Sequence, residues 1–209
     1  MKRTCMNILV IGAGGVGASM ASIAESRSFF QSFILADVSI ESAQRAIEVL
    51  DDPGRFRAVQ LDARSEDNIV ALIREVGADI VVNACDPRLN EPIFRACFTA
   101  GVHYLDMAMN LSRPHPTDPY NQVGDILGKE QLGVHDAWVE KGLLALVGMG
   151  VEPGLSDVFA RYASDHLFDE IDEIGVRDGA NLAIEGYDFA PTFSIWTTIE
   201  ECLNPPLVW

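Results

Sequence analysis

The sequence predicts a doubly wound α/β fold, in which helices cover both faces of a parallel sheet, and three observations support this. Short apolar runs recur along the first 150 residues, segments with a helical spacing of apolar residues separate them, and a glycine-rich turn directly follows the first run. Runs that are apolar throughout are typical of parallel strands, because the helices that connect such strands bury both faces of the sheet.

Six segments are predicted to be strands because none of them alternates with polar residues, as a half-exposed strand would. In chain order they are NILVIG (7–12), FILADV (33–38), AVQLD (58–62), DIVVNAC (79–85), HYLDM (103–107) and LLALVGMG (143–150). Two of the intervening segments carry apolar residues at i, i+3, i+4 and i+7, which predicts helices that lie against the sheet. These stripes are Ala43, Ala46, Ile47 and Leu50, and then Ile69, Leu72, Ile73 and Val76.

The turn GAGGVG (12–17) matches the spacing G-x-G-x-x-G between a strand and a helix. In this context the first glycine permits a tight turn, the second lets the backbone approach a pyrophosphate, and the third allows close packing of the helix. We therefore predict a Rossmann-type dinucleotide site, with these cofactor-binding residues in the turn: Gly12, Gly14, Gly15, Val16 and Gly17. A P-loop would need Lys at position 18, which is Ala18.

Lys2 and Arg3 before the first apolar run also resemble the start of an export signal. The glycines oppose this alternative, because each interior glycine costs a signal helix about 1 kcal/mol relative to alanine.

Asp37 ends the second predicted strand, 20 residues after Gly17. At this distance a carboxylate can accept hydrogen bonds from the adenosine ribose and would repel a 2′-phosphate, so NAD is the preferred cofactor and NADP is a possible one. The alternative is that Asp37 only begins a turn or caps the next helix.

Further cofactor contacts are predicted from position alone, since ligands of this fold bind at the carboxyl ends of the strands. Asp62 and Ala63 follow the third strand, where they could flank the adenine. Asn83, Ala84 and Cys85 end the fourth, where they could approach the nicotinamide ribose. Asn83 could equally be an internal hydrogen-bonding residue.

Composition excludes several functions. The net charge of −16 opposes binding to nucleic acid, and no apolar run approaches the roughly 18 residues of a spanning helix. The four cysteines lack C-x-x-C spacing, which favours free thiols in a reducing cytoplasm. The four histidines are not spaced as metal ligands, and no metal is expected.

The pattern changes after Gly150, which predicts a first domain over 1–150 and the beginning of a second, α+β domain over 151–209. In the second segment a helix is expected over 156–167 and an antiparallel strand over 170–180. This segment holds 12 acidic residues and 2 basic ones, which suits either a solvated face or a pocket for a cationic substrate. The apolar ending NPPLVW suggests an incompletely represented protein.

Three stretches taken together resemble the saccharopine dehydrogenase family, including its carboxynorspermidine synthase branch. They are GAGGVG, VVNACDPRLNEPIFRACFTAGVHYLDMA and GMGVEPGLSDVFARYASDHLFDEIDEI, and the resemblance spans essentially the whole chain. It implies a dinucleotide-binding domain with a substrate and dimerisation domain, a homodimer, and transfer of hydride between a nicotinamide and a carbon–nitrogen bond of a small amine or amino-acid substrate.

Such chemistry needs a group that handles protons on the nitrogen. Asp106, at the end of the fifth strand, and Glu152, before Pro153 and Gly154, are the candidate catalytic residues. A cap remains equally plausible for Glu152, and Tyr104 is expected in the core.

Three functions remain open on the sequence. The first is an imine-reducing dehydrogenase of this family, whose substrate is saccharopine-like or, given only Arg161 and Arg177 after residue 150, polyamine-like. The second is a dehydrogenase of a simple amino acid such as lysine, and the third is a non-catalytic NAD sensor.

Overall fold

A computed structural model describes residues 6–51, 53–177, 179, 183–188, 195, 199, 202–203, 205 and 207–208. The described residues form two compact units. One consists of the residues up to Leu111 together with Leu127–Gly154, and the other consists of Ser112–Ile126 together with the residues from Leu155 onward. The segment 112–126, which the sequence places in the first domain, therefore groups with the second unit.

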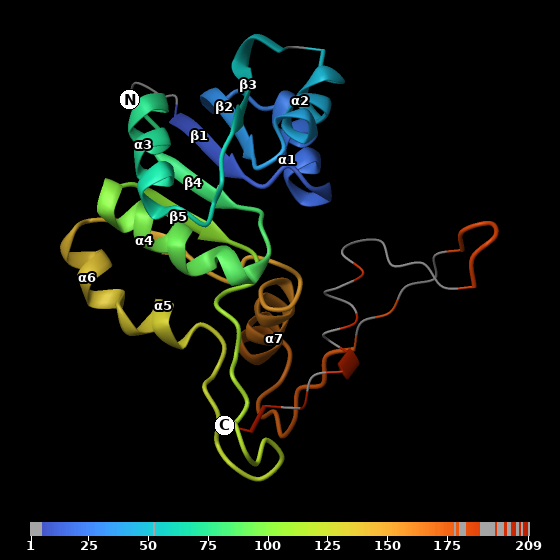
Figure 1. The fold of residues 1–209 in the computed structure, drawn as a ribbon. Helices are drawn as coiled ribbons and strands as arrows, with labels where there is room; N and C mark the ends of the chain where they lie inside the picture. Colours follow the sequence, from blue (N-terminus) through green and yellow to red (C-terminus); the bar gives the residue numbers. More distant parts are fainter. Residues whose placement is uncertain are drawn as a thin grey trace. The chain divides into compact units, whose positions relative to one another are not determined.

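The first unit is built on a parallel sheet with strand order β3-β2-β1-β4-β5-β6 (Figure 1). Its elements in chain order are β1 (Met6–Ile11), α1 (Gly15–Glu25), β2 (Phe30–Asp37), α2 (Ile40–Glu48), the short 3₁₀ helix η1 (Pro53–Arg55), β3 (Phe56–Gln60), α3 (Glu66–Val76), β4 (Ile80–Asn83), η2 (Pro87–Leu89), α4 (Asn90–Ala100), β5 (His103–Asp106), α5 (Lys129–Gly133), α6 (His135–Glu140) and β6 (Ala145–Leu146). All six predicted strands form, and the predicted doubly wound fold is confirmed.

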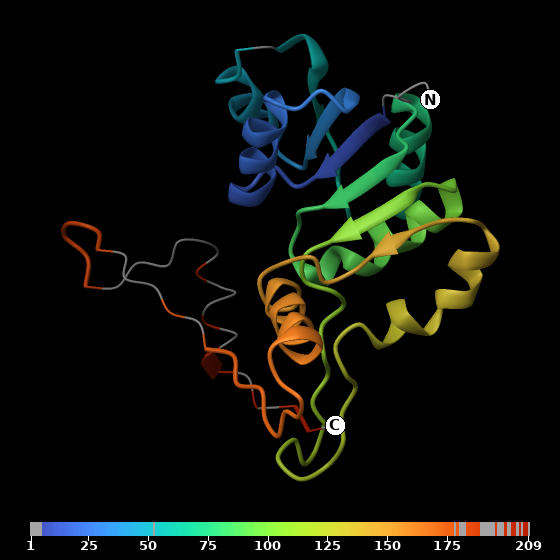
Figure 2. The ribbon, with the colours of Figure 1, turned by 180° about the vertical axis from the view of Figure 1, so that it is seen from behind.

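Helices cover both faces of this sheet, with α1 and α2 on one side and α3 and α4 on the other (Figures 1 and 2). Each face of the sheet has its own apolar core, and alternate residues of β1 contribute to each. Val10 packs in the core on the side of α1 and α2, and Leu9 and Ile11 pack in the core on the side of α3 and α4. Burial of both faces explains why the strand sequences do not alternate between polar and apolar residues. The predicted helical stripes pack on the sheet, and Ala43 and Ile69 are fully buried.

Local signals set the helix ends. Ser39 and Ser65 cap α2 and α3, where each hydroxyl accepts a hydrogen bond from the backbone N–H three residues later. Gly77 and Gly101 follow α3 and α4 with φ of 59° and 77°, in the left-handed region where glycine is favoured.

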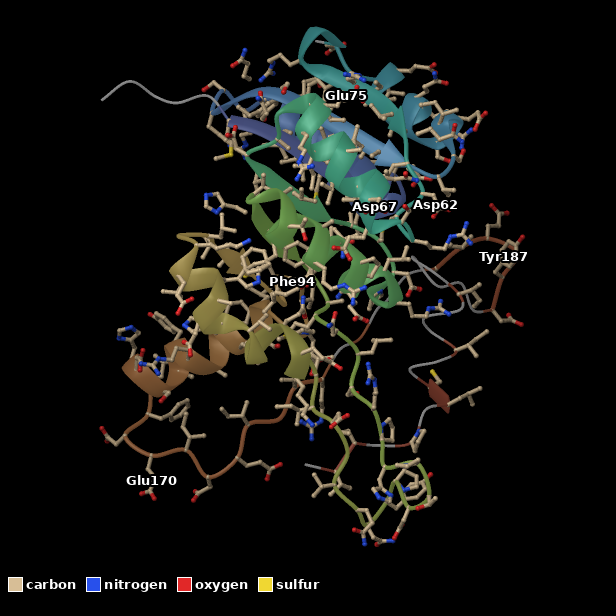
Figure 3. All side chains as sticks on the ribbon, turned by 60° about the vertical axis from the view of Figure 1, so that its left-hand side comes forward. Asp62, Asp67, Glu75, Phe94, Glu170 and Tyr187 are labelled. Carbon is tan, nitrogen blue, oxygen red and sulfur yellow. The ribbon has the colours of Figure 1, made fainter. Side chains whose placement is uncertain are left out.

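In the second unit, α7 (Leu155–His166) corresponds to the helix predicted over 156–167 and begins and ends one residue earlier. The strand predicted over 170–180 is wrong for residues 170–177 and 179, which form no strand; residues 178 and 180 lie outside the described residues. Ile174 and Val176 are 56% and 43% exposed, so this segment buries no apolar face that would stabilise a strand. Glu170 projects from the segment (Figure 3).

Within the described part of the chain, no helix is both long and apolar enough to span a membrane. The same residues contain no group of three or more His, Cys, Asp or Glu side chains arranged to hold a metal ion.

Candidate functional site

A cavity of about 460 Å³ lies at the carboxyl ends of the central strands. Its walls come from the loops that follow β1, β2, β3 and β4, the four strands around the point where the strand order reverses. This is the crevice in which folds of this class bind ligands. The lining residues are Ile11, Gly12, Gly14, Asp37, Val38, Leu61, Asp62, Ala63, Arg64, Ala84, Cys85, Asp86 and Leu89.

The glycine turn is packed too tightly for side chains at two positions. Gly12 has a φ of 108°, and a Cβ there would lie 2.6 Å from the carbonyl oxygen of Ala84. A Cβ on Gly17 would lie 1.9 Å from the carbonyl oxygen of Gly12. Gly14 has no atom within 4 Å of its Cβ position, so the space above it is open to the cavity that it lines. These three environments match the three roles expected of the motif.

The N-terminus of α1 differs from those of its neighbours. Its N-cap is Gly14, no side chain caps it, and its first turn holds no acidic residue. By contrast, α2 and α3 have serine caps and acidic first turns. The backbone N–H groups at the start of α1 and the positive end of its dipole therefore lie at the cavity edge without a side-chain cap, which suits a pyrophosphate site.

Two backbone N–H groups fix the carboxylate of Asp37 on the cavity wall. Oδ2 accepts from Ala13 N at 2.7 Å, and Oδ1 accepts from Ser39 N at 2.9 Å. Asp37 therefore ties the glycine turn to the N-cap of α2, which is part of the turn role considered from the sequence. Each carboxylate oxygen has a second lone pair, so Asp37 can also accept hydrogen bonds from a ribose.

Asp62 and Arg64 form an ion pair in the loop after β3, and both residues line the cavity. Figure 3 labels Asp62. The Arg64 guanidinium donates from Nε to Oδ1 at 2.9 Å and from Nη2 to Oδ2 at 2.6 Å. The Arg64 backbone N–H also donates to Oδ1 at 3.0 Å. These bonds from Arg64 lower the pKa of Asp62 to about 2, so the pair stays ionised at neutral pH.

Cys85 lines the cavity as a neutral thiol. Burial, followed by the negative charges of Asp37 and Asp86, raises its pKa to about 12. Its Sγ lies 3.3 Å from the Ile11 carbonyl oxygen and donates to it. Since the thiolate is the nucleophilic form, Cys85 is suited to shaping the wall and not to attacking a substrate.

A buried polar network lies beneath the loops that follow β5 and β6, and its centre is Asp106, which is 1% exposed. Its Oδ1 accepts from the backbone N–H groups of Met109 at 3.1 Å and Gly148 at 2.8 Å. Its Oδ2 accepts from the Tyr104 hydroxyl at 2.9 Å and from Gln131 Nε2 at 2.7 Å. Burial, and then the charge of Asp106, raises the pKa of Tyr104, which therefore remains a donor.

The rest of the network links this centre to the cavity. Asn83 donates to the Tyr104 hydroxyl at 3.2 Å and to Asn90 Oδ1 at 2.6 Å, and Asn90 donates in turn to the Met109 carbonyl. Asn83 Oδ1 accepts from the backbone N–H of Cys85 at 3.0 Å. Asn83 is 2% exposed, so it occupies the internal position considered for it and does not line the cavity.

Residues 8–146 match the family model for the saccharopine dehydrogenase NADP binding domain. The chain belongs to the saccharopine dehydrogenase family. The resemblance seen in the sequence is therefore confirmed.

Curated relatives match nearly the whole chain. The carboxynorspermidine synthase of Vibrio alginolyticus is 35% identical over 216 residues, which cover 98% of this chain and 50% of that protein. The carboxyaminopropylagmatine dehydrogenase of Synechocystis sp. is 31% identical over 194 residues, 93% of this chain and 46% of that protein. The chain thus spans about half the length of the curated relatives it matches.

Two solved structures show the same fold. Apo saccharopine dehydrogenase from Saccharomyces cerevisiae aligns with a TM-score of 0.59 and 14% identity, covering 78% of this chain and 31% of that one. The dTDP-glucose 4,6-dehydratase of Bacillus anthracis, solved in complex with NAD, aligns with a TM-score of 0.51 and 13% identity, covering 68% and 54%. At such identities the likeness concerns the fold alone.

The structure brings together most of the cofactor-binding residues predicted for this saccharopine dehydrogenase family member. Those on the cavity wall are Gly12, Gly14, Asp37, Asp62, Ala63, Ala84 and Cys85. Gly15, Val16, Gly17 and Asn83 are not among the lining residues. Sequence reasoning missed Ile11, Val38, Leu61, Arg64, Asp86 and Leu89. Their only signal was position, because each lies within a few residues of a strand end.

The two candidate catalytic residues lie in different environments. The buried Asp106 carboxylate accepts four hydrogen bonds from protein groups, two on each oxygen, and these bonds occupy it fully. Glu152 is exposed in the loop after β6, where Gly150 N donates to the Pro153 carbonyl at 3.0 Å and closes a tight turn. An exposed carboxylate can exchange protons with a substrate, whereas a saturated buried one orders the backbone around it.

Proposed function

We propose that the protein is a nicotinamide-dependent oxidoreductase that forms or cleaves a secondary amine. The observation that carries this proposal is the cavity at the strand-order reversal, with the uncapped start of α1 and the Asp37 carboxylate beside each other on its wall. A pyrophosphate fits the first feature and a ribose fits the second. Family membership supports a nicotinamide cofactor.

The reaction that we propose joins an amine and an aldehyde. The amine nitrogen condenses with the aldehyde carbon with loss of water. A reduced nicotinamide held in the cavity would supply the hydride for the carbon of the C=N bond, and one proton from the protein or solvent completes the secondary amine. The protein must orient the dinucleotide, exclude water from the imine and deliver that proton.

Polyamine-like substrates are the class that we favour. The relatives are named carboxynorspermidine synthase and carboxyaminopropylagmatine dehydrogenase, and both names describe carboxylated polyamines. The excess of acidic residues after residue 150 complements a cationic amine. A saccharopine-like pair of amino-acid substrates is the second candidate, supported by the family match.

A substrate screen of the intact protein tests the function. Loss of NADH or NADPH absorbance is followed with aspartate semialdehyde plus a diamine or agmatine, and with aminoadipate semialdehyde plus glutamate. Oxidation that requires both the amine and the aldehyde is expected for at least one polyamine pair. Absence of oxidation with every pair, despite measurable dinucleotide binding, would favour the sensor function.

Glu152 is the residue that we propose to exchange the proton with the nitrogen, and Glu152→Gln tests this. General acid–base catalysis contributes about 10²–10⁴-fold, so turnover is expected to fall by about that factor while dinucleotide affinity stays unchanged. Glu140→Gln, an exposed neutralisation on α6, is the matched control and should leave both quantities unchanged. Equal turnover of the two variants would remove Glu152 from the mechanism.

NAD is the cofactor that we propose over NADP, because Asp37 on the cavity wall would repel a 2′-phosphate. Asp37→Asn is expected to shift the ratio of NAD to NADP affinity toward NADP by about tenfold or more. Since weakening of the glycine turn affects both cofactors alike, the ratio isolates the charge effect. Asp86→Asn removes a charge from the same cavity and should not change the ratio. A ratio unchanged in both variants would contradict the assignment.

We further propose a homodimer in the cytoplasm. The α7 residues Leu155, Val158, Phe159 and Tyr162 are 46–64% exposed at helical spacing, which suits a helix that packs against a partner. The described cysteines Cys85, Cys97 and Cys202 are free, as a reducing compartment allows. Sedimentation equilibrium of the intact protein tests the oligomer, and a monomer at micromolar concentration would contradict it.

A further inference from the structure

We propose that Arg64, held by Asp62, covers one face of the adenine ring of the bound dinucleotide and thereby sets the affinity for its adenosine half. This inference rests on the proposed function, because it requires a dinucleotide in the cavity. It assigns a binding role to a residue that the glycine motif does not include.

The hydrogen bonds of Arg64 decide which kind of partner its guanidinium can take. The Nε and Nη2 edge, which normally forms two parallel bonds with a carboxylate or phosphate, is already occupied by both oxygens of Asp62. The flat faces of the guanidinium are not used by these in-plane bonds. A planar guanidinium stacks well on aromatic rings, so Arg64 suits a purine better than a second anion.

The surroundings of Arg64 also suit a purine. Apolar side chains from the loops after β2, β3 and β4 form the nearby wall, and they are Val38, Leu61, Ala63 and Leu89. Val38 is 62% exposed although it is apolar, and the Arg64 side chain is 77% exposed. A dinucleotide with its pyrophosphate at Gly14 and its ribose at Asp37 would bring its base to this wall and cover these groups.

Charge argues against a 2′-phosphate as the partner of Arg64. The Arg64 charge is already balanced by Asp62, and Asp37 adds a further carboxylate to the cavity wall, while the Asp86 carboxylate on the same wall is paired with Arg88. A second phosphate would have to compete with Asp62 for the guanidinium edge in a region of excess negative charge. A neutral aromatic ring meets neither obstacle.

The chain contains a matched control for this residue. Asp86 and Arg88 repeat the same arrangement after β4, with Arg88 Nε and Nη2 donating to Asp86 at 2.8 and 2.7 Å. Arg88 is also exposed, yet it is not among the residues that line the cavity. Its replacement changes the net charge and breaks the same kind of pair without removing a cavity wall.

Calorimetric titration of the intact protein with NAD, NADP and ADP-ribose tests the inference. Arg64→Met is expected to lower the affinities for NAD and ADP-ribose by the same factor, about fivefold to tenfold, since both ligands contain the adenosine half. The affinity for NADP should fall by that factor too, so the ratio of NAD affinity to NADP affinity stays unchanged. Arg64→Lys keeps the charge but lacks the flat face, and it should bind as weakly as Arg64→Met. Arg88→Met should bind as the wild type does.

The outcomes that overturn the inference are distinct from those that overturn the function. If the wild type binds NAD but Arg64→Met and Arg88→Met behave alike, the inference fails and the proposed function survives. Full affinity in Arg64→Lys would assign the effect to charge, and a much larger loss for NADP than for NAD would place Arg64 at a phosphate; either result overturns the adenine role. If the wild type binds no dinucleotide, both proposals fail.

Discussion

Replacing Asp106 with Asn is expected to lower the free energy of unfolding by about 2–5 kcal/mol, because the position requires an acceptor on both oxygens. Backbone N–H groups of Met109 and Gly148 point at one oxygen, and the Tyr104 hydroxyl and Gln131 amide point at the other. An Asn amide would set its NH₂ against one of these pairs of donors. Each stranded buried donor costs about 1–3 kcal/mol.

The network cannot reverse its direction to accept that NH₂. Gln131 must keep its Oε1 toward the backbone N–H of Asn110, which donates to it at 2.7 Å, and a flipped amide would lose that bond. Asn83 must likewise keep its Oδ1 toward the N–H of Cys85. Backbone groups thus fix the polarity at the ends of the network, and the four donors that reach Asp106 have no reason to turn away from it.

Urea denaturation measures the loss, and amide hydrogen exchange at Met109 and Gly148 should accelerate in Asp106→Asn. Asp67→Asn is the matched control: Asp67 is an exposed residue in the first turn of α3 (Figure 3), where removing the charge costs about 0.3–1 kcal/mol. If the two variants lose the same stability, Asp106 does not organise the network. Unchanged stability with loss of turnover alone would instead return Asp106 to a catalytic role.

Gly17→Ala is expected to cost about 3 kcal/mol of stability and to weaken dinucleotide binding by at least about tenfold. The added Cβ would stand 1.9 Å from the carbonyl oxygen of Gly12, a backbone atom that no side-chain rotation can move away. Gly12 is itself confined by Ala84, so the strain passes into the turn that should hold the pyrophosphate.

Gly15→Ala is the control for this change. Gly15 begins α1, and no atom lies within 4 Å of its Cβ position. Alanine also favours the helix, so stability should stay the same or rise by up to about 1 kcal/mol. Thermal unfolding measured with and without NAD separates the two effects. A Gly17→Ala protein as stable as Gly15→Ala would show that the turn can relax, against the geometry described.

Much of the fold could be predicted because its determinants are local. The run 7–12 is apolar on both faces because helices cover both faces of the sheet. The glycine spacing of 12–17 indicates a tight turn, because neighbouring backbone atoms leave no room for a side chain at Gly12 and Gly17. Asp37 was found for the same reason, because its distance from Gly17 along the chain reflects one helix and one strand.

The exposed segment after α7 shows where local patterns fail. Residues 170–177 have partly alternating polarity, but such a strand needs a partner strand and a surface to cover, and Ile174 and Val176 remain exposed. The Asp106 network was equally beyond the sequence. It joins residues 25 and 42 positions apart, and nothing in the local sequence distinguishes a carboxylate that meets substrate from one that meets four donors.

The sequence by itself determined which segments along the chain form the strands, where the glycine turn lies and which acid ends β2. Periodicity and the steric demands of neighbouring residues encode these features. Tertiary structure alone decided the environments of the remaining acids. It buried Asp106 among donors from three separate segments, left Glu152 at the surface and closed Asp62 onto Arg64 at the cavity. The reason is physical: the chemistry of a carboxylate depends on its solvation and its hydrogen-bond partners, and folding supplies both from distant parts of the chain.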